Sequence, residues 1–181
     1  MKDIVIFTAI FGKIDRLPKQ HFSHPRVDFV CFTEDDINVE GWKIRKCPLW
    51  NNDPIKTSKM YKIIPHTFFK DYKYCIWIDG HVVVENTILD PFKYIDNEKY
   101  DAVFLEHNEV NSLYGEAEHL IQLWHKGNRK DTPANIRSHI QKYKDEGYPS
   151  DNGLIETTVI WRKLDNEKLN EVMDLWWAEV M

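Results

Sequence analysis

A strand-like run, broken by an acid, a glycine and a histidine, occupies Tyr74-Cys75-Ile76-Trp77-Ile78-Asp79-Gly80-His81-Val82-Val83-Val84. Because the run is apolar on both faces, it predicts a strand buried inside an α/β sheet, where each large apolar side chain contributes roughly 1.5–3 kcal/mol. An unpaired buried carboxylate would cost more than one such side chain contributes, so we expect Asp79 to lie where the strand emerges or to bind a cation. Gly80 would let another group approach the backbone closely. The run therefore indicates a metal and phosphate site at the end of a strand, and a turn of solvated polar residues is the alternative.

The composition favours one α/β domain and excludes two classes of partner. The chain has 181 residues, of which 43% are hydrophobic, enough for one domain with a proper core. Its formal net charge is −5, with 24 basic residues among 29 acidic ones, so we expect neither nucleic acid nor an anionic membrane surface as a partner. Cys31, Cys47 and Cys75 lack CxxC spacing and are expected to be reduced core thiols, which favours a cytoplasmic location. No leader precedes the first strand and no run reaches membrane-spanning length, so we expect a soluble protein without an integral membrane segment.

Apolar runs elsewhere in the chain predict the remaining strands, and each run is delimited by turn residues. The run at 102–105 is expected to be buried. The predicted strands, besides the one at 74–84, are 4–10, 27–32, 42–47, 102–105 and 154–162.

Apolar residues at helical spacing predict the helices. Thr57 or Ser58 is expected to cap the first helix, and Pro65 to kink or end it. The apolar side of this helix would be Met60, Ile64 and Phe68. The other predicted helices are a short one after Asp90-Pro91, one from Leu113 to Gly127, one from Thr132-Pro133 to Gly147, and a last one capped by Asp165 with the stripe Leu169, Val172, Met173, Trp176 and Val180.

Strands that alternate with helices predict an α/β sandwich with a mostly parallel sheet. In such sheets ligands bind outside the carboxyl ends of the strands. Phe11-Gly12, Asp79-Gly80-His81 and His107 would all lie at that edge.

The chain contains several short motifs. Each of them is weak evidence alone, but their order along the chain is specific for one kind of domain. They are Thr8-Ala9-Ile10-Phe11-Gly12 with Asp15, Asp28-Phe29-Val30-Cys31-Phe32-Thr33, Lys62 with Pro65-His66, Trp77-Ile78-Asp79-Gly80, and the segment from Pro149 to Glu156. From about residue 4 to the C-terminus, the chain resembles the glycosyltransferase-like domain of plant mucilage-related and turgor-regulation proteins and their bacterial relatives.

The resemblance implies a GT-A-type fold, a three-layer sandwich around a Rossmann-type sheet. It also implies transfer of a sugar from a nucleoside-diphosphate donor to a glycan or glycolipid acceptor. Related transferases hold a divalent metal with Asp-x-Asp, where this chain has Asp79 and His81. Mn²⁺ accepts imidazole better than Mg²⁺ does, and one carboxylate with one histidine makes a weaker site than two carboxylates. Mn²⁺ or Mg²⁺ is the cofactor that the resemblance implies, and lysines are the alternative source of positive charge at the departing diphosphate.

The resemblance also suggests roles for residues on the donor side. Thr8, Gly12 and Asp15 are expected to meet the nucleotide through the first loop. Lys59 and Lys62 lie on one face of a predicted helix and could bind a phosphate or the donor sugar, although spacing alone fits ordinary surface lysines.

On the acceptor side, Asp151, Asn152 and Glu156 occupy a turn that leads into a strand, resembling the region that holds the sugar. We expect Asn152 to contact the donor, and Glu156 or Asp151 to act as a base toward the acceptor hydroxyl if the reaction inverts. The structural alternative is an Asx-type turn followed by a solvent-facing strand acid.

We expect one domain over 1–181. Relatives continue with an Arg-Asp-Gln segment that is absent here, so either part of the donor or acceptor site is missing or the chain is truncated at its C-terminus. Two other functions compete with sugar transfer. One is a non-catalytic module that binds a nucleotide sugar or a glycan, and the other is a metal-dependent hydrolase that uses Asp79, His81 and His107.

Overall fold

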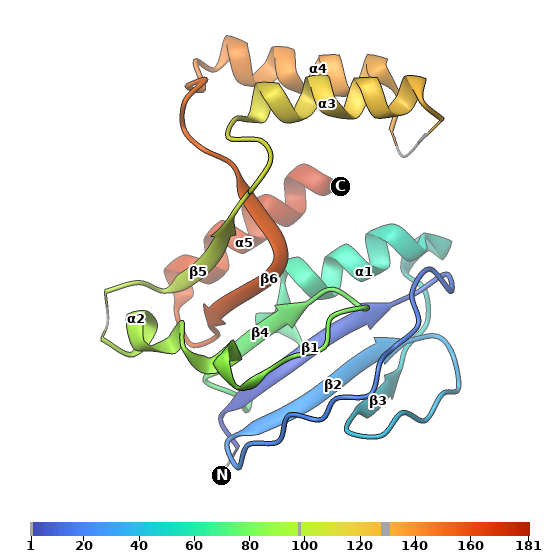
Figure 1. Cartoon of the computed structure of the whole chain (residues 1–181), viewed down its shortest axis with the longest axis vertical. Coiled ribbons are helices and arrows are strands. Elements are labelled where there is room, and N and C mark those ends of the chain that lie inside the picture. Colours follow the sequence, from blue (N-terminus) through green and yellow to red (C-terminus); the bar gives the residue numbers. More distant parts are fainter. Residues whose placement is uncertain (1, 98, 128–130) are drawn as a thin grey trace. The chain divides into compact units, whose positions relative to one another are not determined.

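The computed structural model describes residues 2–97, 99–127 and 131–181. These residues form a six-stranded sheet in the order β3-β2-β1-β4-β6-β5 (Figure 1). The strands are β1 (Ile4–Ile10), β2 (Val27–Thr33), β3 (Lys43–Lys46), β4 (Tyr74–Ile78), β5 (Ala102–Glu106) and β6 (Ile155–Lys163). The contacts divide the chain into two compact units, residues 1–104 with 158–181 and residues 105–157, and each is described by itself.

The sheet is mostly parallel, as predicted. β1 pairs in parallel with β2 and with β4, and β2 pairs in parallel with β3. β6 runs antiparallel to β4, with Ile78 opposite Val159. The mixed α/β fold predicted from the sequence is therefore confirmed.

β1 is buried along its whole length because both of its faces carry apolar side chains. Ile4, Ile6 and Ile10 pack into one hydrophobic cluster, whereas Val5 and Phe7 pack into the other. Successive side chains of a strand point to opposite faces, so a strand covered on both sides has a continuous apolar sequence.

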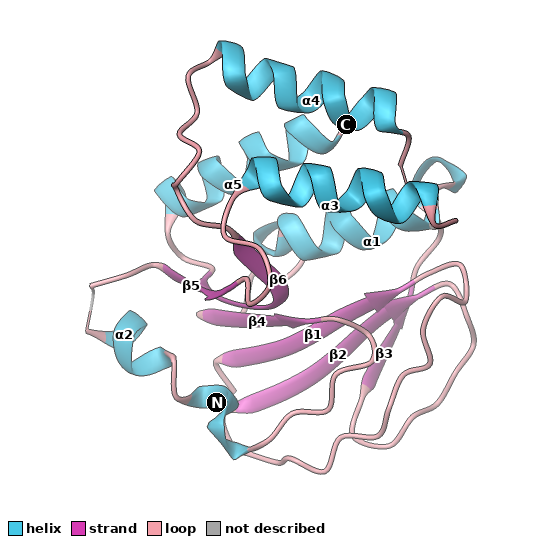
Figure 2. Ribbon diagram, turned by 45° about the horizontal axis from the view of Figure 1, so that its top comes forward, coloured by secondary structure: helices cyan, strands magenta, loops and turns pink. Residues whose placement is uncertain are grey.

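Different kinds of structure cover the two faces of the sheet (Figure 2). One face packs against the helices α1 (Pro54–Ile63) and α5 (Glu167–Val180), through residues that include Tyr61 and Trp176. The other face packs against the long loops after β1, β2 and β4 and the short helix α2 (Phe92–Asp96), with Leu17 and Trp42 among the buried residues. Short 3₁₀ turns complete this unit at Trp50–Asn52, Pro65–Thr67 and Asn86–Leu89.

The first helix begins earlier than predicted. Asp53 caps α1, because its side chain accepts a hydrogen bond from the backbone N–H of Lys56 and Pro54 occupies the first turn. The predicted cap Thr57 is buried and donates its hydroxyl to the carbonyl of Asp53. α1 ends at Ile63, before Pro65, so the prediction that this helix extends to Phe68 is wrong.

β4 is shorter than the predicted strand, because it ends at Ile78 rather than continuing to Val84. The buried side chain of Gln20 satisfies the backbone beyond that point. Its Nε2 donates to the carbonyl of Val82 at 2.8 Å, and its Oε1 accepts from the N–H of Val84 at 3.0 Å. A side-chain amide thus replaces a neighbouring strand there.

Three smaller predictions are also corrected. The cap of α5 is Asn166, whose side chain accepts from the N–H of Leu169, and not Asp165. Val172 does not face the core, since it is 54% exposed. β5 is half-buried at its start and exposed at Leu105, because it is the edge strand of the sheet.

The second unit contains two helices, α3 (Leu113–His125) and α4 (Pro133–Asp145), which confirm both predicted helices. Ser112 and Thr132 cap them, each accepting a hydrogen bond from a backbone N–H of the first turn. Their apolar faces share a small cluster that consists of Ala117, Ile121 and Ile136, with Ile140 packed against it.

Candidate functional site at the carboxyl end of β4

Asp79 directly follows β4 and begins a turn. Its N–H donates to the carbonyl of Thr158 on β6 at 2.9 Å, and its own carbonyl accepts from the N–H of Val82 at 3.0 Å. The side chain of Asp79 is 33% exposed. The carboxylate therefore lies where the strand emerges from the sheet, which is one of the two placements expected from the sequence.

Two donors meet one oxygen of this carboxylate. The indole Nε1 of Trp77 lies 2.8 Å from Asp79 Oδ1, and the ammonium of Lys62 lies 3.3 Å from the same atom. Hydrogen bonds to a charged acceptor stabilise by about 1.5–3 kcal/mol, so the carboxylate has a defined orientation.

Lys62 belongs to the last turn of α1 and is not an ordinary surface lysine. Its side chain is 16% exposed, and its ammonium lies 5.3 Å from the centre of the Trp77 ring, within range of a cation–π interaction. Burial lowers the pKa of Lys62, and the Asp79 carboxylate opposes that change. Lys59, on the same helix, is exposed.

Arg162 supports the end of α1 from β6, and sequence reasoning missed it. It is fully buried, and it donates from Nη2 to the carbonyl of Lys62 at 2.6 Å and from Nη1 to the carbonyl of Ile63 at 3.1 Å. A cation at the C-terminus of a helix satisfies unpaired carbonyls and interacts favourably with the helix dipole. The signal in the sequence was an arginine directly after the apolar run Val159-Ile160-Trp161.

Gly80 permits the loop after β1 to reach the Asp79 turn. A Cβ atom on Gly80 would lie 2.9 Å from Ile10 Cγ1 and 3.0 Å from Asp15 Oδ2. This confirms the expected close approach at Gly80, and it brings the Asp15 carboxylate beside the turn that carries Asp79.

The donor set at this turn fits a resident divalent cation poorly. Asp79 Oδ1 already accepts from two donors, and His81 is exposed. Within residues 2–97, 99–127 and 131–181, no three His, Cys, Asp or Glu side chains form a group that could hold a metal ion. Two unit charges 4 Å apart interact by about 4 kcal/mol at an effective dielectric constant of 20, so a cation at this carboxylate would be repelled by the Lys62 ammonium.

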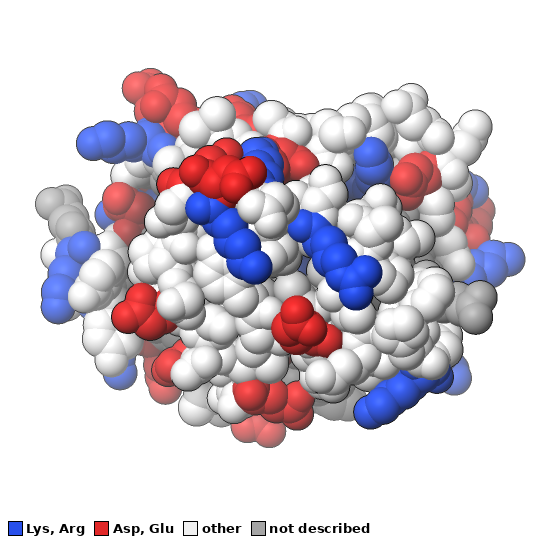
Figure 3. Space-filling model, turned by 90° about the horizontal axis from the view of Figure 1, so that it is seen from above, with Lys and Arg blue, Asp and Glu red and all other residues white. Residues whose placement is uncertain are grey.

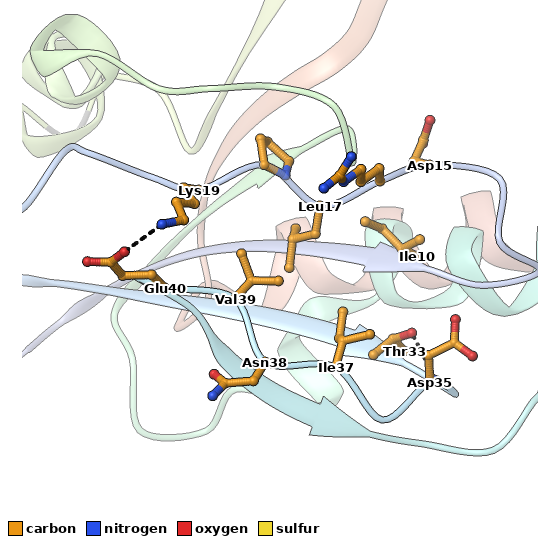
Figure 4. Close-up of a pocket in the computed structure, with 12 residues that line it drawn as sticks. Ile10, Asp15, Leu17, Lys19, Thr33, Asp35, Ile37, Asn38, Val39 and Glu40 are labelled. Atoms are coloured by element: carbon orange, nitrogen blue, oxygen red, sulfur yellow. Dashed lines mark hydrogen bonds and ion pairs between the residues drawn. The ribbon is translucent and has the colours of Figure 1, made fainter.

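A cavity of about 870 Å³ lies at the same edge of the sheet, between the loops that follow β1 and β2. Figure 4 shows apolar side chains of Ile10, Leu17 and Val39 around it, while the Asp15 carboxylate points away. An ion pair of 2.9 Å between Lys19 and Glu40 joins the two loops. The polar residues of the lining are Asp15, Arg16, Lys19, Thr33, Asp35, Asn38 and Glu40.

The other two residues predicted on the first strand and loop have different surroundings. Thr8 is completely buried within β1, and its hydroxyl has no hydrogen-bond partner in the described part of the chain. Gly12 is exposed with a φ of 70°, and its N–H donates to Glu34 Oε1 at 2.7 Å. Gly12 thus ties the loop after β1 to the end of β2.

Asp151, Asn152 and Glu156 belong to the second unit. Asp151 and Asn152 are exposed in a turn, and Asn152 donates from Nδ2 to the hydroxyl of Tyr148 at 3.1 Å, whereas Glu156 is half-buried. His107 is in the same unit, and its Nδ1 accepts from the N–H of Val110 at 3.0 Å. The roles predicted for these residues stay predictions.

The charged surface and the lengths of the helices bear on two possible partners, nucleic acid and a membrane. On the face drawn in Figure 3, basic and acidic side chains are interspersed, without the broad basic area that nucleic-acid binding uses. None of the helices in the described residues is long and apolar enough to cross a membrane.

Three comparisons with known proteins complete this description. The crystal structure of mouse xyloside xylosyltransferase 1 in its apo form is similar over 99% of this chain and 74% of its own, with 8% sequence identity and a TM-score of 0.47. Among curated proteins, the comparison found no match. A family model, the TOD1/MUCI70 glycosyltransferase-like domain, matches residues 1–180, which confirms the resemblance inferred from the motifs. The chain therefore belongs to the TOD1/MUCI70 glycosyltransferase-like domain family.

Proposed function

We propose that this domain transfers a sugar from a nucleoside-diphosphate donor to a hydroxyl of a glycan or glycolipid acceptor. The observation that carries the proposal is the Lys62–Asp79 pair at the carboxyl end of β4. Family membership supports the reaction class, and ligands of open α/β sheets bind at this edge.

In this proposal the nucleoside occupies the cavity beside Leu17, and the diphosphate lies toward the turn at Asp79. Asp15 connects the cavity and the turn, because it lines the cavity and its carboxylate lies against Gly80 of the turn. Thr33, at the end of β2, and Arg16 could contact the ribose and the phosphates. Gly12 shapes the loop rather than contacting the donor through a side chain.

The reaction breaks the bond between the anomeric carbon and the diphosphate, so negative charge grows on the departing diphosphate. A positive charge held at that point stabilises the transition state. Its two candidate sources are the ammonium of Lys62 and a divalent cation bound by Asp79 and His81, which would supply the same neutralisation. Asp151 or Glu156 is the proposed base toward the acceptor hydroxyl if the reaction inverts.

The first test is binding of the donor. Titration calorimetry with uridine and guanosine diphosphates and their sugars is expected to find at least one ligand. Lys62→Met should weaken it at least about tenfold, because a charge-assisted hydrogen bond is lost. Lys168→Met is the matched control, since Lys168 is an exposed lysine on α5 outside the predicted site, and it should bind as the native chain does. Absence of binding across the whole panel would contradict the proposal.

A second candidate is a non-catalytic module that binds the same donor. The single carboxylate of the Asp79-Gly80-His81 turn favours it, because related transferases carry two. Release of the nucleoside diphosphate from the bound donor, by transfer or by hydrolysis, separates the two functions. Tight binding without any release would support the binding module.

A further inference from the structure

We propose that the ammonium of Lys62, and not a divalent cation, is the positive charge that this site places against the donor diphosphate. The inference rests on the proposed function. It assigns Lys62 a catalytic role that a metal ion fills in transferases with an Asp-x-Asp motif.

The first argument is the free hydrogen-bonding capacity of Lys62. An ammonium group has three N–H donors. In the described part of the chain, its one hydrogen-bond acceptor is Asp79 Oδ1, at 3.3 Å. Two donors therefore remain for a ligand, and the Lys62 side chain is 16% exposed, so it is partly accessible while largely shielded from water.

The second argument is that the ammonium is held in place before any ligand binds. Arg162 fixes the backbone of Lys62 through its carbonyl, at 2.6 Å. Trp77 fixes the counter-charge by donating to Asp79 Oδ1, and its ring lies 5.3 Å from the ammonium. A charge that needs no rearrangement stabilises a transition state better than one that must be ordered during the reaction.

The third argument is the balance of charges around the Lys62 ammonium. Lys62 and Arg162 contribute two cations, and Asp79 and Asp15, which lies beside Gly80, contribute two carboxylates. Among the described residues, no carboxylate is hydrogen-bonded to Arg162, whose Nη atoms donate to backbone carbonyls. Arg162 therefore adds a positive charge behind Lys62 that no hydrogen-bonded carboxylate offsets, which favours an anionic ligand over a metal ion beside the Lys62 ammonium.

The fourth argument is the ligand set that a metal would need. Mg²⁺ and Mn²⁺ take about six ligands, mainly oxygen. Asp79 Oδ1 is engaged by two donors, and His81 is exposed. Asp79 acts instead as a positioning residue, which holds Lys62 by one oxygen.

The test is calorimetric binding of uridine and guanosine diphosphates to the full chain, in buffer with EDTA and in buffer with Mn²⁺. The expected result is an affinity in EDTA within about threefold of that in Mn²⁺, a loss of at least about tenfold in Lys62→Met, and partial retention in Lys62→Arg. Lys168→Met is again the matched control, and circular dichroism confirms that each variant folds.

The outcomes separate the two proposals. Binding that appears only with Mn²⁺, and that Asp79→Asn abolishes, would overturn the inference and leave the proposed function intact. Equal affinities of native chain and Lys62→Met in EDTA would overturn it as well. Absence of binding in both buffers would contradict the proposed function and the inference together.

Discussion

Arg162 on β6 and Lys62 at the end of α1 are joined by a hydrogen bond of 2.6 Å, although one hundred residues separate them in the chain. The bond links the strand beside β4 to the helix that carries the candidate catalytic lysine. A buried guanidinium with backbone carbonyls as its acceptors is therefore part of the support of the site.

Replacement of Arg162 by Met is expected to destabilise the protein by about 2–4 kcal/mol. The two carbonyls at the end of α1 would lose a charged donor, and each buried acceptor left unpaired costs roughly 1–3 kcal/mol. Urea unfolding measures the change. Because Met fills a similar volume, unchanged or increased stability would show that the cost of burying this cation exceeds the value of its hydrogen bonds.

The central strands could be predicted from the sequence because β1 and β2 are buried on both faces, which leaves a continuous apolar run. The end of β4 could not be predicted in the same way. Val82 and Val84 continue the apolar pattern, but the Gln20 side chain binds their backbone from 62 and 64 residues away. No local pattern contains a contact of that kind.

Gly80→Ala is expected to cost about 1–3 kcal/mol of stability and to weaken donor binding. The added Cβ would lie 2.9 Å from Ile10 Cγ1, too close for an ordinary contact, so the loop after β1 or the turn at Asp79 must move. Thermal unfolding and calorimetry with the diphosphates measure the two effects.

Gly127→Ala is the comparison for this variant. Gly127 has a φ of 100°, and among the described residues no atom lies within 4 Å of an added Cβ, so the substitution strains the backbone by about 1–2 kcal/mol. It is expected to lower stability and to leave donor binding unchanged. A loss of binding in both variants would mean that the effect of Gly80→Ala is general destabilisation.

At the site, the strand-end position of Asp79 was predictable because a carboxylate after a buried strand must emerge or be paired. The partners of Arg162 were not predictable, since two of its acceptors are backbone carbonyls, which every residue has. Thr8 shows that a motif does not reveal how far a side chain is buried, and its predicted contact with the nucleotide stays a prediction. Its position in a recognisable motif suggested a ligand contact, whereas its side chain is closed off inside β1.

Hydrogen exchange is expected to distinguish the two units. The cluster shared by α3 and α4 contains Ala117, Ile121 and Ile136, far fewer side chains than the clusters on the sheet, so less burial opposes local opening. Amides of α3 and α4 should exchange at least about a hundredfold faster than those of β1. Ile121→Ala should accelerate α3 and α4 further and leave β1 unchanged, and equal acceleration in β1 would show that the units open together.

Acid unfolding is expected to report on Asp28. Burial alone would raise its pKa, but hydrogen bonds from Lys2, Lys43 and Tyr72 outweigh burial and lower the pKa from 3.8 to about 2. A carboxyl with a lowered pKa contributes stability that is fully present above its unfolded value and is lost as the pH falls through its folded value. Asp28 should thus contribute about 2 kcal/mol at neutral pH that disappears between about pH 4 and pH 2.

The variant Asp28→Asn isolates this contribution, because the other carboxylates, including Asp3 with its Arg26 partner, remain. Urea unfolding at pH 6 and at pH 2.5 is expected to show a larger loss of stability in the native chain than in the variant. Asp36→Asn is the matched control, since Asp36 is 94% exposed and its pair with Lys46 is long, at 3.5 Å. Parallel pH profiles of the native chain and Asp28→Asn would rule out a lowered pKa at Asp28, because the stability difference between them must shrink as the carboxyl becomes protonated in both states.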